Sequence, residues 1–122
     1  KNIMTNEKAE AKAAIRDRLR DRGQIMEPEP VDFFGEKLFI RPLSGRQRAK
    51  LARIQTAGKI PDDWFGMVIV QALCDESGEL IYNDSHAAEV ASFEGAELDA
   101  LTQRILKLSK LSDEAIEEEE KN

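Results

Sequence analysis

The feature that most constrains the fold of this chain is an apolar stretch, WFGMVIVQALC, at residues 64–74. Phe65, Val68 and Ile69 recur in it at helical spacing, and further apolar side chains cover the other side. A helix that is apolar nearly all round must be buried. Periodicity alone leaves a buried strand open, but the Pro-Asp-Asp that begins at Pro61 is typical of a first helical turn. We therefore predict a central buried helix that begins near Pro61 and includes the whole stretch.

Two short segments with strand character precede this stretch. A Phe-Phe pair that ends at Phe34 forms the first, residues 38–40 form the second, and a Gly-Glu pair lies between them. A two-residue connection with glycine first is typical of a type II′ turn, so we predict a hairpin that turns at Gly35 and Glu36. In that register Phe34 and Phe39 share one face of the hairpin.

A basic helix follows the hairpin. Ser44 and Gln47 match the S-x-x-Q pattern of a capping box, in which each side chain accepts a hydrogen bond from the other residue's backbone N–H. We predict a helix over about Gly45–Thr56. Spacings of four and three place three of its basic side chains on one outer face: Arg46, Lys50 and Arg53.

The other elements follow from local composition. Residues 5–22 are strong helix formers with a thin apolar stripe of Ile15 and Leu19, and a linker with two prolines follows them. Beyond the apolar stretch we predict, in order, a turn at 75–79, an extended piece at 80–82, helices at about 85–91 and 94–109, and an acidic end.

These elements predict a mainly helical α+β fold, with a small β-hairpin packed on a bundle of four to five helices. We expect three parts along the chain. They are a charged N-terminal helix and linker at residues 1–30, a globular domain at 31–112, and an acidic C-terminal tail at 113–122.

Groups that could perform catalysis are few. His86 is the single histidine, and a lone histidine in such a place is more often a helix-start residue than a catalyst. Cys74 is the single cysteine, which excludes an intramolecular disulfide and fits a reducing cytosol. The acidic runs lack the spaced ligands of a calcium loop, and no Gly-rich phosphate loop follows a strand. We therefore predict no catalytic residue, metal or cofactor, and the short apolar runs predict no membrane span.

Charge is distributed unevenly along the chain. Residues 1–60 contain 14 Lys or Arg and 8 Asp or Glu, whereas residues 61–122 contain 4 and 16. A dipolar chain of this kind can self-associate head to tail or present different faces to two partners, although ordinary solvated helix faces have the same composition. The basic helix is also similar to a phosphate-contacting stripe, but the pI of about 4.9 argues against nucleic acid as a partner.

The order of the elements and their sequence motifs resemble those of one protein family. A G-E-K-L-F-I-R-P-L-S motif leads into a helix that begins S-G-R-Q-R, and an apolar helix ending A-L-C-D-E-S-G-E-L-I-Y-N-D and a leucine-spaced helix follow. From about Phe33 to Asn122, the chain resembles the tail assembly chaperones of long, non-contractile-tailed bacteriophages and their prophage relatives. Two signatures carry most of this resemblance, at Arg41–Ser44 and in the L-S-D-E-A-I-E-E of Leu111–Glu118.

The resemblance implies a non-enzymatic role in the host cytoplasm. Proteins of this family coat the tape measure protein, keep its long hydrophobic helices soluble, help recruit tail tube protein, and are not expected in the finished virion. Many are made in two lengths by programmed frameshifting. The codons of Glu120, Lys121 and Asn122 can form a slippery A-AAA-AAC run, so we hypothesise that this chain is the shorter product, which the gene sequence would test.

A chaperone of apolar helices needs a reversible apolar groove surrounded by solubilising charge. The alternative for every aromatic residue is ordinary core packing. The aromatic residues that we expect in the groove are Phe34, Phe39, Trp64 and Phe93. The basic residues that we expect at a partner or at a neighbouring copy are Arg41, Arg46, Lys50 and Arg53.

Two other functions stay open at this point. A structural tail or head–tail component that remains in the virion would have the same chemistry, and mass spectrometry of purified virions separates it from a chaperone. A DNA-binding phage regulator would use the basic helix at residues 44–56, and a gel shift with random duplex at low salt tests it.

Overall fold

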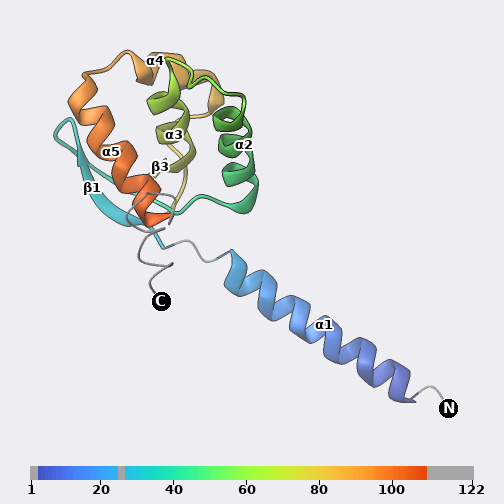
Figure 1. The fold of residues 1–122 in the computed structure, drawn as a ribbon. Helices are drawn as coiled ribbons and strands as arrows, with labels where there is room; N and C mark the ends of the chain where they lie inside the picture. The colour runs from blue at the N-terminus through green and yellow to red at the C-terminus, as the bar shows by residue number, and fades with distance from the viewer. Residues whose placement is uncertain (1–2, 25–26, 110–122) are drawn as a thin grey trace, which may run out of the picture.

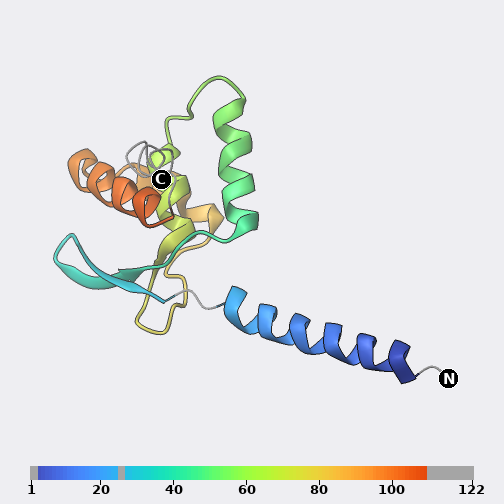
Figure 2. The ribbon, with the colours of Figure 1, turned by 60° about the horizontal axis from the view of Figure 1, so that its bottom comes forward.

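The computed structural model of the chain describes residues 3–24 and 27–109. It confirms the mainly helical α+β fold, and in Figures 1 and 2 helix α1 projects away from the body that the later elements form. The elements are α1 (Ile3–Gly23), β1 (Glu29–Phe33), β2 (Glu36–Ile40), α2 (Gly45–Thr56), α3 (Trp64–Ala72), β3 (Leu73–Cys74), the 3₁₀ helix η1 (Asp84–His86), α4 (Ala87–Ala91) and α5 (Gly95–Leu108).

Helix α3 is the centre of the core, as the apolar stretch predicts. Val68, Ile69 and Ala72 are fully buried, and in Figure 1 α3 lies between α2 and α5. The backbone of α4 lies directly on α3, because a methyl group on Gly66 would overlap the carbonyl oxygen of Ala87. Glycine is therefore required for this approach of two helices.

The central helix ends two residues earlier than predicted. Leu73 has extended backbone angles, φ −69° and ψ 123°, and with Cys74 it forms β3. Strand β3 pairs antiparallel with β2, so that Ile40 lies opposite Leu73 and Phe39 opposite Cys74, and the sheet order is β1-β2-β3. The helical prediction for these two residues was wrong because pairing with a distant strand satisfies their backbone groups.

The hairpin turns one residue earlier than predicted. Phe33 pairs with Glu36, and both turn residues have positive φ, 50° at Phe34 and 80° at Gly35. These angles define a type I′ turn, whose twist matches that of the strands, and the predicted type II′ turn was wrong. The partner of Phe33 changes by two residues, from Leu38 to Glu36, so the side chains of the strands keep their faces. Phe39 lies on the face opposite to Phe33, as in the predicted register. Phe34 leaves the strand and becomes a turn residue, so it does not share a strand face with Phe39.

Most of the remaining elements agree with expectation. The capping box of α2 is formed, since Ser44 N donates to Gln47 Oε1 at 2.8 Å and Gln47 N donates to Ser44 Oγ at 3.2 Å. Strand β1 begins at Glu29, inside the predicted linker, and its proline occupies an edge strand. Within the described ranges, no helix has the length and apolar character needed to cross a membrane. The predicted acidic tail and the frameshift position lie outside the described residues.

Candidate partner-binding groove

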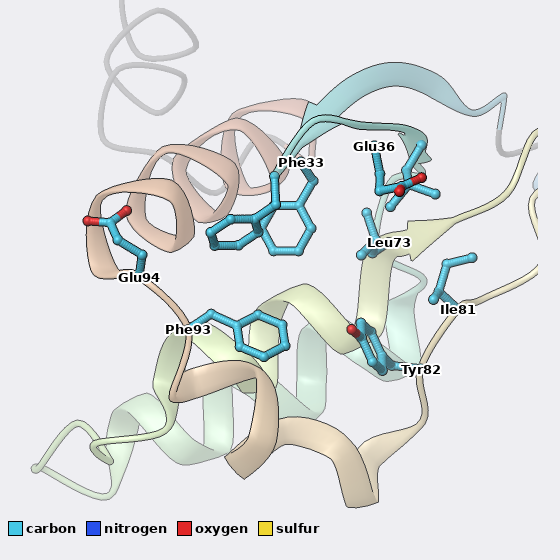
Figure 3. A pocket seen from close by; sticks show the side chains of 9 residues that line it. Phe33, Glu36, Leu73, Ile81, Tyr82, Phe93 and Glu94 are labelled. Carbon is cyan, nitrogen blue, oxygen red and sulfur yellow. The ribbon is translucent and has the colours of Figure 1, made fainter.

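An open apolar groove of about 580 Å³ lies between the hairpin and the segments that follow β3 and α4 (Figure 3). Its walls come from parts of the chain that are far apart in sequence. We call it the aromatic groove, and its lining residues are Phe33, Phe34, Leu38, Leu73, Ile81, Tyr82 and Phe93, with the carboxylates Glu36 and Glu94.

The hairpin turn carries Phe34 to the edge of this groove. Its φ of 50° lies in the left-handed region, which bulky side chains rarely adopt. The backbone N–H of Phe34 donates to Glu97 Oε1 at 3.1 Å, and its ring packs edge-on against Phe33 and Phe93, with centroid distances of 4.7 and 5.7 Å. These contacts still leave Phe34 45% exposed. An unfavourable backbone conformation thus presents an aromatic ring to solvent, which is typical of a functional position.

The side of the groove opposite to the hairpin turn, which we call its floor, is built on the segment after β3. Ile81 N donates to Leu73 O at 3.1 Å, which holds this segment against the sheet. In Figure 3, Leu73, Ile81 and Tyr82 gather on one side of the groove, and Phe93 points into it from another. The Tyr82 ring lies 5.4 Å from the His86 ring.

The rim of the groove is acidic. Glu94 is the N-cap of α5, and its carboxylate accepts hydrogen bonds from Glu97 N at 2.8 Å and Ala96 N at 3.0 Å. These bonds, above all the one from Glu97 N, lower the pKa of Glu94, so it is anionic at neutral pH. With Glu36 it borders an apolar floor. Such a surface favours an apolar segment that carries basic residues beside it.

Two of the four predicted groove aromatics meet in this groove, Phe34 and Phe93. Phe39 is absent from its lining because it lies on the face of the hairpin opposite to Phe33 and Leu38, which line the groove. Trp64 lines a separate hollow of about 430 Å³ that also includes Leu51 of α2 and Leu106 of α5. A role for any of these residues in partner binding stays a prediction.

The predicted basic contact residues fall into two groups. Arg41 Nη1 donates to Gly78 O at 2.7 Å, and Lys50 forms an ion pair with Asp84, so these two residues have partners within the chain. Arg46 and Arg53 are exposed on α2. Only this second group presents basic side chains freely enough to suggest an external contact.

Sequence reasoning missed most of the floor of the groove. The apolar pattern assigns Leu73 to a helix, and the local sequence gives no sign that it joins a sheet. The extended piece at residues 80–82 is predicted, and its bridge between Leu80 and Cys74 is the contact that brings Ile81 and Tyr82 to the groove. That contact depends on the turn at Asp75, whose Oδ1 accepts from Ser77 N and Glu79 N, a pattern that could have been anticipated.

The side chains that could take part in catalysis have structural roles in the fold. His86 Nδ1 accepts a hydrogen bond from Asn83 N at 3.0 Å, as a helix-start residue does. Cys74 is buried, and burial raises the pKa of its thiol. Among the described residues, no three His, Cys, Asp or Glu side chains form a group that could hold a metal ion.

Comparison with known proteins agrees with the resemblance seen in the sequence. No protein-family model and no curated protein matches the chain. The structure of the bacteriophage HK97 tail assembly chaperone is similar, with a TM-score of 0.56 and 15% sequence identity. The match covers 75% of this chain and 96% of that chain. The chain therefore has the fold of a bacteriophage tail assembly chaperone.

Proposed function

We propose that this chain is a phage tail assembly chaperone that binds apolar helical segments of the tape measure protein and assists tail tube polymerisation. The observation that supports it best is the aromatic groove, an exposed apolar floor with an acidic rim, on the fold of a tail assembly chaperone. The binding mode would be helix-in-groove recognition. Its partners would be tape measure and tail tube proteins, it would act in the host cytoplasm, and it would perform no catalysis.

The size of the groove suits a chaperone, which must release its client. Phe34 and Ile81 are each a little under half exposed, and full burial of a large apolar side chain contributes about 1.5–3 kcal/mol. The cost of association, about 4–15 kcal/mol, exceeds what these two half-exposed side chains alone would contribute. One copy would therefore bind weakly, and several copies along one long client would bind firmly through avidity.

The test is co-expression with the tape measure protein of the same phage, followed by measurement of the soluble client. Ile81→Glu places a carboxylate on the groove floor, and we expect it to abolish the solubilising effect. Ile60→Glu is the matched control, since Ile60 is exposed and does not line the groove. Equal solubilisation by the two variants would contradict the proposal.

A structural tail component is the second candidate function, and it differs from a chaperone in that the protein would remain in the finished virion. A chaperone should be absent from purified virions by mass spectrometry, whereas a structural component should be present in many copies.

The self-association predicted from the charge asymmetry is a separate proposal. It is tested by reversing Arg46 and Arg53 to Glu, which should remove a salt-sensitive oligomer.

A further inference from the structure

Most of the large apolar side chains that are exposed in the described residues lie on two surfaces. Ile15 and Leu19 are 46% and 62% exposed on α1. Phe34 and Ile81 are 45% and 44% exposed in the aromatic groove. The fifth, Ile60, lies in the loop after α2. The two surfaces thus offer one apolar pair each.

The apolar pair of α1 lies at the centre of a basic face. Residues three, four or seven positions apart share a face of a helix. By this spacing the basic neighbours of Ile15 and Leu19 are Lys8, Lys12, Arg16, Arg18 and Arg22. Three of the four acidic residues of α1, Glu10, Asp17 and Asp21, lie on the other side of the helix, and Glu7 lies at the edge of the basic face. A surface that covers the apolar pair should therefore be apolar with carboxylates around it.

The aromatic groove has that composition. Its floor is apolar, and Glu36 and Glu94 border it. A third carboxylate, that of Glu97, is bound to the backbone N–H of Phe34 at the groove edge. Opposite charges thus surround the two apolar pairs, which is the complementarity that orients a docking helix.

We propose that α1 of a second copy of this chain docks in the aromatic groove, with Ile15 and Leu19 on its apolar floor and the basic residues beside them facing Glu36 and Glu94. The chain's own α1 does not fill the groove, since every described side chain of α1 except that of Ala13 is exposed. Figures 1 and 2 both show α1 directed away from the hairpin. Reciprocal exchange of two helices would close a dimer, and one-way exchange would extend an open chain.

This inference does not rest on the proposed function, because it needs only α1 and the groove. If the groove binds both an apolar client and α1 of a second copy, the client and α1 compete for the aromatic groove. Self-association would then cover the apolar floor until a client replaces α1.

The first test is sedimentation velocity of the full chain over a range of concentrations. We expect the wild type to associate, and Leu19→Glu and Ile81→Glu each to raise the dissociation constant at least about tenfold, which corresponds to about 1.4 kcal/mol. Higher salt should weaken the association, because it screens the charges that surround both pairs. Ile60→Glu introduces the same carboxylate outside both surfaces and should behave as the wild type.

Mixing the two variants separates exchange between chains from other causes. Leu19→Glu keeps an intact groove, and Ile81→Glu keeps an intact α1. In an equimolar mixture, the intact α1 of one variant can dock in the intact groove of the other. The mixture should therefore form a heterodimer and associate more strongly than either variant alone. A wild type that stays monomeric at every concentration, whether its α1 enters its own groove or none, overturns the proposal. Equal weakening by Ile60→Glu, or a mixture without heterodimer, overturns it as well.

Discussion

The close contact between α3 and α4 predicts that adding one methyl group at Gly66 is severely destabilising. In Gly66→Ala, the new Cβ would overlap the Ala87 carbonyl oxygen and lie 2.8 Å from its carbon and 3.0 Å from Ala91 N. Carbon atoms pack best at about 3.5–4.0 Å, so α4 must retreat by at least about 0.7 Å. The neighbour is helix backbone, which cannot turn aside as a flexible side chain does. Phe93 follows α4, so its ring would also leave its place 5.7 Å from Phe34.

The expected loss follows from two opposing effects. Alanine in place of glycine within a helix normally stabilises by up to about 1 kcal/mol. Over-packing of a close-packed core costs about 1–3 kcal/mol and occasionally more. Because the clash is with backbone, we predict a net loss of about 2 kcal/mol or more in the free energy of unfolding, which lowers Tm by roughly 10 °C or more.

Urea denaturation followed by circular dichroism measures this loss. Gly95→Ala is the matched control, since Gly95 begins α5 and a methyl group added there would meet no atom of another part of the fold within 4 Å. We expect the control to equal or exceed the wild type in stability. A Gly66→Ala variant within about 0.5 kcal/mol of the wild type, the range of ordinary surface substitutions, would refute the close approach of α3 and α4.

Three further predictions concern polar groups of the fold. Ser109→Ala removes the hydroxyl that accepts from Leu43 N at 3.1 Å, and the buried N–H left behind should cost about 1–3 kcal/mol in a denaturation experiment. Thr102 Oγ1 is buried without a hydrogen-bond partner among the described residues, so Thr102→Val should leave Tm unchanged or raise it. The pKa of Asp84 is lowered in the folded chain, mainly by the hydrogen bond from Lys50. The ionised Asp84 carboxylate therefore stabilises the folded chain fully above the unfolded pKa of about 3.9, and this stabilisation fades as the pH falls through the lower folded pKa. The stability advantage over Asp84→Asn should therefore shrink below about pH 4, and it should stay under about 1 kcal/mol at neutral pH because the Asp84 side chain is 64% exposed.

The elements that depend on local patterns could be predicted from the sequence. The capping box at Ser44 and Gln47 places the start of α2, and the apolar periodicity around Ile69 identifies the core helix. The patterns failed where tertiary pairing decides the structure. Leu73 joins a sheet because β2 lies beside it, and Phe34 rather than Glu36 enters the turn because the strands pair in that register.

The groove itself was predictable only in part for the same reason. Phe34 and Phe93 were expected to line one groove, and they do. Phe39 was assigned to it because Phe34 was taken as a strand residue on the same face, whereas Phe34 lies in the turn and Phe39 lies on the face opposite to Phe33. Ile81 was not predicted, because its place depends on the bridge between Cys74 and Leu80.

The central claim is that Phe34 is held in its unfavourable conformation in order to offer a ring to a partner. Asn-Gly is a favoured pair in a type I′ turn, so Phe34→Asn removes the ring and relieves the backbone. The relief, about 1–2 kcal/mol, should offset the loss of two aromatic contacts of about 0.5–1.5 kcal/mol each. Isothermal titration with helical fragments of the tape measure protein, beside a thermal melt, measures both properties. We predict a Phe34→Asn variant within about 1 kcal/mol of wild-type stability that binds at least about tenfold more weakly. A stable variant with wild-type affinity would contradict the claim.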